Sequence, residues 1–375
     1  MSAAPERGPA VLLAGGGTAG HVAPLLATAE RLREELPDVR LLVLGTAEGL
    51  EARLVPERGF ELALVPRVPL PRKPSVDLLR LPGRLAGAVG AARAAIRRIE
   101  ADVVVGFGGY VATPAYLAAR RAGVPVVVHE QNSLPGIANR VGARWAQHVA
   151  VTFPGTPLPR AEHTGMPLRR EITALAAAPP AERARARSAA RLALGLDPDR
   201  PTLLVTGGSL GAQRLNEVLP QAAAELLAAG GQVLHAAGRG KEVRLGDLAH
   251  PEHYQVRPYL DDMGAAYAAA DLVLGRSGAG TVSELTALGL PGVYVPLPIG
   301  NGEQARNAAA VVEAGGGMLV ADADLDATIV RERVLPLLTD PSALGAAARA
   351  AAAFGVHDGD ARLVALVRDA MGARS

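Results

Sequence analysis

The 375-residue chain contains no cysteine, and this absence excludes several kinds of site. Without thiols there is no disulfide framework, no thiolate zinc site and no cysteine nucleophile. Aromatic residues make up only 3% of the chain, which argues against stacking platforms for nucleic-acid bases. Lys and Arg number 39 against 37 Asp and Glu, a formal net charge of +2. We therefore expect no nucleic-acid partner.

Long hydrophobic runs are also missing. The longest uncharged apolar stretch runs from Leu285 to Gly302 and is interrupted by Pro291, Pro296 and Pro298. Such a stretch does not predict a transmembrane helix. The first nine residues hold no apolar core of signal-peptide length. We therefore expect a cytosolic protein that touches a membrane surface.

Short apolar runs alternate with helical segments, and this order predicts an α/β protein with parallel sheets. The length favours two domains. Strands are expected at residues 10–14, 40–45, 102–106, 124–129, 202–206, 232–236, 271–275 and 292–296. A helix is expected at residues 22–36, and the Ala- and Arg-rich segment 170–193 is expected to form one polar connecting helix.

Two motifs occur twice, which indicates an internal duplication. VLLAGGGTAG at residues 11–20 parallels TLLVTGGSLG at residues 202–211. DVVVGFGG at residues 102–109 parallels DLVLGRSG at residues 271–278. Two similar halves predict two Rossmann-like domains, whose ligands bind beyond the carboxyl ends of the strands. We expect the two sheets to face each other across a deep cleft.

The glycine-rich loops after these strands have competing interpretations. GGGTAG at residues 15–20 fits a dinucleotide-binding turn, in which backbone N–H groups approach a phosphate at a helix N-terminus. A nicotinamide site and a purely structural turn both stay open. GGSLG at residues 207–211 fits a hydrolase nucleophile elbow. Because Thr18 occupies the matching position in the first half, a duplicated phosphate cradle explains both loops better than a serine hydrolase does.

Polar side chains near the loops also have two interpretations each. Glu284, three residues after Thr281, either completes a capping box or holds a ribose diol. His21 is either a general base or a helix-start residue bonded to nearby backbone. HEQN at residues 129–132 is either a polar-ligand loop or a solvated turn.

The chain also carries paired carboxylates and a basic segment. No metal site is expected, and the following residues are interpreted as solvated turn residues away from the glycine loops: Asp197, Asp199, Asp322, Asp324, Asp358 and Asp360.

Seven basic residues and one acidic residue lie between Leu70 and Ile99, with leucines among them. Such a segment suits an anionic membrane surface. The alternative is an amphipathic helix that covers a sheet and keeps its arginines in water.

Taken together and in this order, the motifs resemble those of the bacterial MurG family. They are GGTAGH at 16–21, GFGGYV at 106–111, HEQN at 129–132, GGSLGA at 207–212 and RSGAGTVSE at 276–284. The resemblance implies a GT-B fold. It places an acceptor- and membrane-binding domain at residues 1–168, against which a C-terminal helix at about 355–375 packs, and a UDP-GlcNAc-binding domain at residues 169–354.

The activity that the resemblance implies is an inverting glycosyl transfer. GlcNAc would pass from UDP-GlcNAc to the 4-hydroxyl of MurNAc in lipid I, the undecaprenyl-diphosphate-MurNAc-pentapeptide, giving lipid II and UDP for peptidoglycan synthesis. The alternatives are a GT-B transferase with a soluble acceptor, an NAD(P)-binding protein and a non-catalytic UDP-sugar-binding protein. No tightly bound cofactor is expected, although free Mg²⁺ could stimulate the reaction.

The same resemblance implies a location and partners. The protein would lie at the cytoplasmic face of the cell membrane, held peripherally by anionic inner-leaflet lipid through the segment between Leu70 and Ile99. Cell-wall and cell-division proteins are candidate partners, with roles in cell shape and the cell cycle.

Donor contacts follow from the resemblance residue by residue. Leu260 would meet uracil through its backbone, Glu284 would hold the ribose hydroxyls, and Ser209 would meet the diphosphate. Gln304 and Asn307 would read the GlcNAc hydroxyls. The other implied donor contacts are Thr18, Ala19, Gly20, Asn132, Arg169, Arg276, Ala279 and Thr281.

The catalytic and acceptor residues lie in the first half. His21 is predicted as the general base and Glu130 as the competing base. The acceptor diphosphate is predicted at Gly17, the 18–21 segment, Gly108, Gly109 and Tyr110. Three positions depart from the family pattern: Met166 replaces a usual Asn, Ala19 replaces a common Gly, and no basic residue precedes Gln304.

Overall fold

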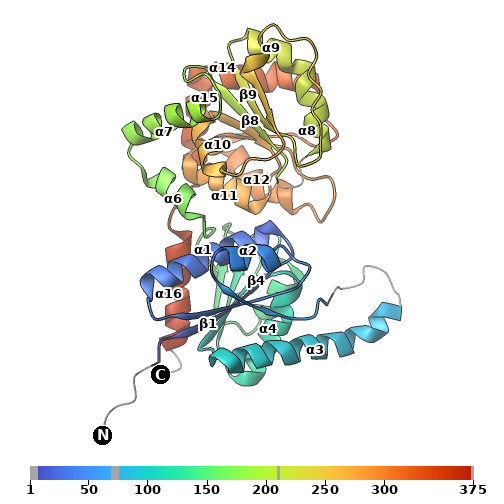
Figure 1. Cartoon of the computed structure of the whole chain (residues 1–375), viewed down its shortest axis with the longest axis vertical. Coiled ribbons are helices and arrows are strands. Elements are labelled where there is room, and N and C mark those ends of the chain that lie inside the picture. The colour runs from blue at the N-terminus through green and yellow to red at the C-terminus, as the bar shows by residue number, and fades with distance from the viewer. Residues whose placement is uncertain (1–6, 69–75, 209–211, 373–375) are drawn as a thin grey trace. The chain divides into compact units, whose positions relative to one another are not determined.

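The computed structural model describes residues 7–68, 76–208 and 212–372 (Figure 1). Its contacts divide the chain into two compact units. The first unit joins Met1–Arg169 with Asp358–Ser375, and the second unit is Arg170–His357. Each unit is built around one parallel sheet.

The first unit has a seven-stranded sheet in the order β3-β2-β1-β4-β5-β6-β7, with every pair parallel. Its strands are β1 (Ala10–Gly15), β2 (Arg40–Gly45), β3 (Glu61–Leu64), β4 (Val103–Gly108), β5 (Val126–Glu130), β6 (His148–Val151) and β7 (Ala161–His163). Its helices are α1 (Ala19–Glu35), α2 (Glu51–Glu57), α3 (Val76–Ile99), α4 (Gly109–Ala122), α5 (Ile137–Gly142) and α16 (Gly359–Gly372).

Helices cover both faces of this sheet, which explains its continuous apolar strands. Ala10, Leu12 and Ala14 of β1 join a core cluster with residues of α3 and α4. Val11 and Leu13 alternate to the opposite face and pack with residues of α1 and α16. Side chains alternate between the faces of a strand, so both sets of β1 are buried.

The second unit has a six-stranded parallel sheet in the order β10-β9-β8-β11-β12-β13. Its strands are β8 (Thr202–Thr206), β9 (Gln232–Ala236), β10 (Tyr254–Arg257), β11 (Leu272–Gly275), β12 (Gly292–Tyr294) and β13 (Gly317–Leu319). Its helices are α6 (Arg170–Ala177), α7 (Pro180–Ala193), α8 (Gln213–Val218), η1 (Leu219–Ala222), α9 (Ala223–Ala228), η2 (Pro251–His253), α10 (Met263–Ala269), α11 (Ala279–Leu288), α12 (Glu303–Glu313), α13 (Ala327–Ile329), η3 (Val330–Val334), α14 (Leu335–Thr339) and α15 (Pro341–Ala352).

The central strands of both sheets confirm the sequence prediction, and the other elements correct it in three places. The expected single helix at 170–193 is wrong, because α6 ends at Ala177 and Pro180 begins α7, a position that proline favours. The helix expected from residue 22 begins already at Ala19. The outer strands β3, β6, β7, β10 and β13 were not predicted, and each has only three or four residues.

The duplication extends to an aspartate at the amino end of each sheet. Asp102 Oδ2 accepts a hydrogen bond from the Ala10 N–H at 2.8 Å, and Asp271 Oδ2 accepts one from the Thr202 N–H at 2.7 Å. Each carboxylate also binds a guanidinium, from Arg7 and Arg191 respectively. We call these two arrangements the aspartate clamps.

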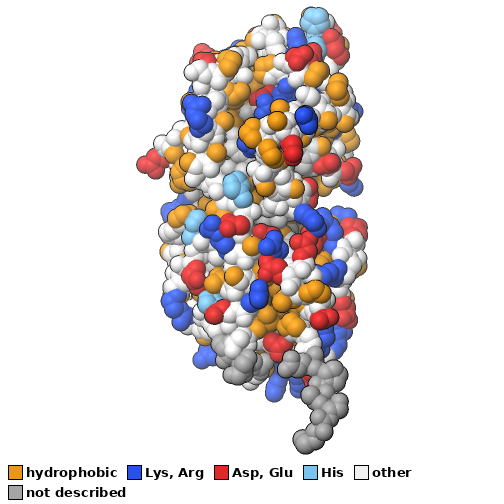
Figure 2. All heavy atoms as spheres, turned by 90° about the vertical axis from the view of Figure 1, so that its left-hand side faces the viewer, with side chains coloured by type: hydrophobic (Ala, Val, Ile, Leu, Met, Phe, Trp, Pro, Cys, Tyr) orange, Lys and Arg blue, Asp and Glu red, His pale blue; other side chains and the backbone are white. Residues whose placement is uncertain are grey.

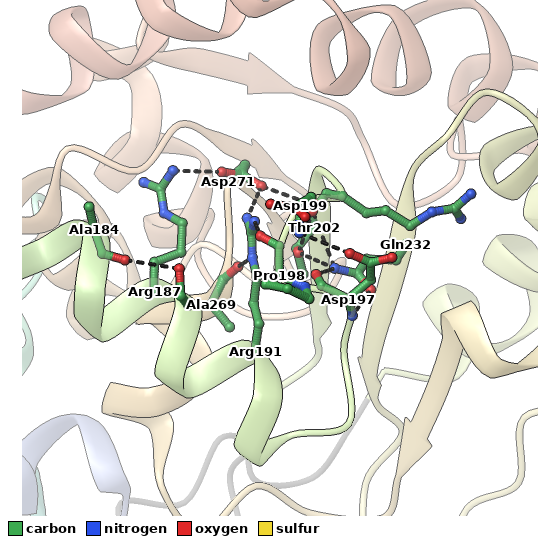
Figure 3. A network of polar contacts seen from close by, with 12 residues as sticks. Ala184, Arg187, Arg191, Asp197, Pro198, Asp199, Thr202, Gln232, Ala269 and Asp271 are labelled. Atoms are coloured by element: carbon green, nitrogen blue, oxygen red, sulfur yellow. Dashed lines mark hydrogen bonds and ion pairs between the residues drawn. The ribbon is translucent and has the colours of Figure 1, made fainter.

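The clamp of the second unit is the more elaborate one (Figure 3). Arg191 is 5% exposed, and its Nη2 lies 2.5 Å from Asp271 Oδ2. The same guanidinium donates to the carbonyls of Ala269 at 3.0 Å and Pro198 at 2.7 Å. Arg187 reaches the other carboxylate oxygen at 3.2 Å. The clamp therefore ties α7 to the start of β8 and β11.

Helix α16 follows the second unit in sequence but packs in the first, beside α1 (Figure 1). Its Leu363, Val364 and Val367 are fully buried in the cluster around β1. His148 Nε2 of β6 lies 2.8 Å from Asp369 Oδ2 of α16. The last helix thus completes the first core.

Within the described ranges, no helix combines the length and apolarity that crossing a membrane requires. Figure 2 shows acidic and basic side chains intermixed over one face, in keeping with the near-zero net charge.

Candidate functional site

The turn after β1 is held by Glu51, a fully buried carboxylate at the start of α2 that the sequence analysis did not identify. Its Oε2 accepts a hydrogen bond from the Gly17 N–H at 2.8 Å. Its Oε1 accepts from the Thr46 N–H at 2.9 Å and the Thr46 hydroxyl at 2.8 Å. Burial alone would raise the pKa of Glu51, but these hydrogen bonds outweigh it and hold the pKa below its usual value. A negative charge therefore lies beneath the turn.

Three glycines make room for this carboxylate. A Cβ at Gly16 would lie 2.2 Å from Glu51 Oε1, and one at Gly49 would lie 2.1 Å from Oε2. A Cβ at Gly45 would lie 2.5 Å from Glu51 Cγ. The sequence signal that could have identified Glu51 is this set of glycines after β1 and β2.

His21 lies in the first turn of α1, and Thr18 is the N-cap residue. The His21 Nδ1 is 3.0 Å from the Thr18 hydroxyl. Its ring packs over Gly108 at the end of β4, where a Cβ would lie 3.3 Å from the ring. Burial lowers the pKa of His21, so the imidazole is neutral at pH 7 and can accept a proton.

The loops after β1 and β4 adjoin. A Cβ at Gly109 would lie 2.5 Å from the Gly16 carbonyl oxygen, and Gly109 has a φ of +78°. Strands β1 and β4 are neighbours although they are not consecutive in sequence. This is the switch point of the sheet, where ligands of such folds bind. The structure thus brings Gly17, His21 and Tyr110 to one edge.

Glu130, at the end of β5, is 2% exposed and organises its own loop. Its carboxylate accepts hydrogen bonds from the Asn132 N–H at 2.9 Å, the Gly136 N–H at 3.0 Å and Asn139 Nδ2 at 2.9 Å. The Tyr116 hydroxyl in turn donates to Asn139 Oδ1 at 2.7 Å. Burial raises the pKa of Glu130, and these hydrogen bonds oppose the rise. The geometry favours a positioning role over that of a base.

The solvated-turn interpretation of HEQN is wrong. His129, Glu130 and Gln131 are at most 2% exposed. His129 Nε2 lies 3.1 Å from the Gly165 carbonyl, and burial lowers the pKa of His129 to about 4. This segment is a buried support, and it places Asn132 beyond the carboxyl end of β5.

In the second unit, the capping-box interpretation of Glu284 is wrong. Helix α11 begins at Ala279 after Gly278, so Thr281 lies inside the helix and is not its N-cap. Glu284 Oε2 accepts a hydrogen bond from the Tyr267 hydroxyl at 2.9 Å. The ribose-diol role of Glu284 stays a prediction.

Arg276, at the end of β11, joins three loops of the second unit. Its Nη1 donates to the carbonyls of Val295 at 3.2 Å and Pro296 at 3.1 Å, and lies 2.5 Å from Asp322 Oδ1. Asp322 is therefore not a solvated turn residue away from the glycine loops, as the sequence suggested. The bonds of Arg276 fix the loops after β11, β12 and β13.

The sugar-reading candidates are also anchored. Gln304 Oε1 accepts a hydrogen bond from the Leu297 N–H at 2.9 Å. Asn307 is 2% exposed, and its Nδ2 donates to the Ser277 carbonyl at 3.4 Å. Leu260 is 8% exposed and lies between β10 and α10.

Most predicted residues cluster by unit. Those at the carboxyl edge of the first sheet are Gly17, Thr18, Ala19, Gly20, His21, Gly108, Gly109, Tyr110, Glu130 and Asn132. Those at the carboxyl edge of the second sheet are Leu260, Arg276, Ala279, Thr281, Glu284, Gln304 and Asn307. Arg169 is the last residue before the second unit. Ser209 lies outside the described residues. Among the described residues, no three His, Asp or Glu side chains lie together as metal ligands would.

Two family models match the chain. The glycosyltransferase family 28 N-terminal domain matches residues 11–151, and the glycosyltransferase family 28 C-terminal domain matches residues 202–363. The first match covers β1 to β6, and the second covers β8 to β13 and extends into the first residues of α16.

Curated relatives match over nearly their whole length. A protein of Clavibacter michiganensis subsp. michiganensis is 57% identical over 364 residues, covering 97% of both chains. One of Streptomyces coelicolor is 55% identical over 366 residues, covering 97% of this chain and 99% of the relative. Both are named UDP-N-acetylglucosamine--N-acetylmuramyl-(pentapeptide) pyrophosphoryl-undecaprenol N-acetylglucosamine transferase.

Solved structures agree with the fold. MurG of Acinetobacter baumannii superimposes with a TM-score of 0.77 at 28% identity, covering 96% of this chain and 99% of that one. The calicheamicin glycosyltransferase CalG4 gives a TM-score of 0.66 at 21% identity, covering 98% of this chain and 100% of that one. The second likeness shows the fold alone.

Proposed function

This chain belongs to glycosyltransferase family 28, and we infer from that membership that it transfers GlcNAc from UDP-GlcNAc to the MurNAc-pentapeptide of lipid I. The observation that supports this function is sequence identity. The chain is 53–57% identical, over 95–97% of its length, to curated proteins named as this N-acetylglucosamine transferase. The two parallel-sheet units have the GT-B fold. The product, lipid II, serves peptidoglycan synthesis.

For the chemical step, we propose an inverting displacement with His21 as the base. The 4-hydroxyl oxygen of MurNAc attacks the anomeric carbon from the face opposite UDP. As that bond forms, the bond to the β-phosphate oxygen breaks and its electron pair leaves with UDP. The hydroxyl proton passes to the neutral imidazole. We propose that Nδ1 carries the hydrogen and donates it to the Thr18 hydroxyl, 3.0 Å away, which leaves Nε2 as the nitrogen that takes the proton.

The leaving diphosphate gains negative charge, which the second unit is suited to stabilise. Helix α11 begins at Ala279, soon after the carboxyl end of β11, and no capping side chain accepts from the N–H groups of its first turn. Such groups stabilise developing anions. We propose that no tightly bound cofactor is needed, and that free Mg²⁺ stimulates the reaction at most.

A membrane location is supported by the excess of basic residues in the segment 70–99, seven against one acidic residue. In the second half of α3, Ala88, Ala92 and Ile96 are buried and Arg93 and Arg97 are exposed. This half is the amphipathic helix of the alternative interpretation. The basic residues Arg72 and Lys73 lie outside the described residues. We propose that the chain docks on anionic lipid at the cytoplasmic face through residues 70–87, and that cell-wall and division proteins meet it there.

Vesicle sedimentation tests this docking. Replacing Arg80 and Arg84 together by Glu should weaken binding to anionic vesicles by about 1 kcal/mol for each basic charge lost. The matched control replaces Arg93 and Arg97 by Glu and should have a smaller effect. If both double variants and the native chain bind vesicles equally at all salt concentrations, α3 does not dock on lipid and is only a solvated helix.

The activity itself is tested by incubation with UDP-GlcNAc and a lipid I analogue. Mass analysis should show one added N-acetylhexosamine, and NMR should show a β-linked product from the α-linked donor. Treatment with EDTA should leave transfer measurable. A product only with soluble sugar acceptors would instead support the soluble-acceptor alternative.

A further inference from the structure

A small pocket of about 70 Å³ lies beside the glycine turn of the first unit. Its walls come from the loops after β1, β2 and β3 and from the first turn of α4. The lining residues are Gly16, Gly17, Thr46, Glu48, Gly49, Arg67, Tyr110 and Val111. Residues predicted to meet the acceptor diphosphate therefore share this pocket with side chains to which no role has been given.

The charges around the pocket are unfavourable for an anion. The Gly17 N–H, which a phosphate-binding turn would offer to its ligand, is bonded to Glu51. Glu51 is ionised, since its pKa is lowered. Glu48 adds an exposed carboxylate to the wall. A diphosphate at this turn meets two carboxylates, and it needs a cation to offset them.

Arg67 is the basic side chain that lines the pocket. It follows β3, is exposed, and has no ion-pair partner within the described ranges of the chain. Its guanidinium lies over the Tyr110 ring, 5.1 Å from the ring centre. Such a cation–π contact orients the guanidinium while leaving its N–H groups free. The planar fork of Arg matches two phosphate oxygens.

We propose that Arg67 binds the diphosphate of the lipid-linked acceptor, and that Tyr110 holds the Arg67 guanidinium in place for it. This rests on the proposed function, since it assigns the cation that recognises the acceptor of that reaction. Glu51 fixes the glycine turn after β1, and Arg67 supplies the positive charge that this turn lacks. Glu48 opposes the same ligand.

The test uses the full chain and a lipid I analogue with a short prenyl chain, without vesicles. Arg67→Gln should raise the acceptor KM by roughly 10- to 100-fold, the range of a lost charged hydrogen bond. The KM for UDP-GlcNAc should be unchanged. Arg67→Lys should recover part of the loss, and Glu48→Gln should lower the acceptor KM. The matched control is Arg121→Gln, an exposed arginine about 18 Å along α4 from Gly109.

Calorimetric binding of the analogue, without UDP-GlcNAc, separates this proposal from the activity. If the native chain binds the analogue but transfers nothing, the proposed function fails while Arg67 can still be tested. Equal analogue affinity for the native chain and a folded Arg67→Gln variant would overturn the proposal. A separate sedimentation assay uses anionic vesicles. If Arg67→Gln loses vesicle binding while its analogue affinity is unchanged, the proposal is overturned as well, because Arg67 would then contact lipid headgroups.

Discussion

His21 carries the sharpest prediction at the scale of single residues. His21→Ala should lower kcat by about 10²–10⁴-fold, the usual contribution of a positioned base, because no other group then takes the hydroxyl proton. UDP-GlcNAc binding should persist. Steady-state kinetics with saturating acceptor give kcat, and a mutant that retains most of its turnover would exclude His21 as the base.

The pH profile gives a second measurement of the same residue. The base must be neutral, and burial lowers the pKa of His21 below its ordinary 6.5. Native kcat/KM should therefore stay constant as pH falls to about 6.5 and decline only at lower pH. His21→Ala should lose this decline. A mutant impaired only in acceptor KM would make His21 a diphosphate ligand.

Glu284 is predicted to carry donor affinity. Glu284→Gln keeps the size but removes the charge, so each hydroxyl bond of the ribose weakens. Charged hydrogen bonds contribute about 1.5–3 kcal/mol, and UDP affinity should fall at least several-fold in calorimetry. Tyr267→Phe, which removes the hydroxyl that donates to Glu284, is the matched control and should change affinity less. Unchanged UDP binding by Glu284→Gln would remove this residue from the donor site.

The sequence motifs identified residues that lie at the carboxyl edges of the sheets, but they missed a buried residue that supports those edges. Gly17 and His21 belong to a motif that is continuous in sequence. Glu51 is 34 residues from Gly17, with which it shares a hydrogen bond, and its local signal is limited to the nearby glycines Gly45 and Gly49. Glu130 was predicted as the competing base because its loop was expected to face the same cleft as His21. Only the structure shows that this carboxylate accepts hydrogen bonds from two backbone N–H groups of its own loop and from Asn139 of α5.

Among the elements, the clamp at Asp271 is predicted to stabilise the second unit. Asp271→Ala leaves the buried Arg191 guanidinium without its carboxylate, which typically costs about 3–5 kcal/mol. Urea unfolding should show this loss. The control is Glu225→Ala, whose exposed pair with Arg331 should contribute about 0–1 kcal/mol.

The position of the Asp271 clamp separates its effect on stability from an effect on donor binding. It lies at the amino ends of β8 and β11 (Figure 3), and the donor-site candidates lie at the carboxyl ends. Folded Asp271→Ala protein should therefore bind UDP normally. Equal unfolding midpoints for the two variants would show that the clamp does not stabilise the unit.

Central strands were predictable because burial on both faces gives them continuous apolar runs, such as VVV in β4. The edge strands β7 and β13 have no such signal. Ala161–His163 is exposed along its length, and the pairing of β7 depends on β6 beside it. Tertiary context decides such strands.

At the scale of the whole molecule, the core of the first unit depends on a distant segment. A chain that ends at His357 lacks α16, and with it the fully buried Leu363, Val364 and Val367. Each such side chain contributes about 1.5–3 kcal/mol by burial. Hydrogen exchange should show lost protection at β1 and β4, while the second unit still binds UDP. Arg368→Ala, an exposed position on the same helix, is the control and should leave protection intact.

The same crossing of the chain has a consequence for biosynthesis. A ribosome that has completed Met1–Arg169 must add the 188 residues of Arg170–His357 before it reaches α16. At ~5–20 residues per second, this interval lasts roughly 10–40 s. Throughout it, the apolar face of β1 that α16 later covers stays open on the nascent chain. The unit that emerges first is therefore the last to be finished, and during translation this face is the natural site for a chaperone.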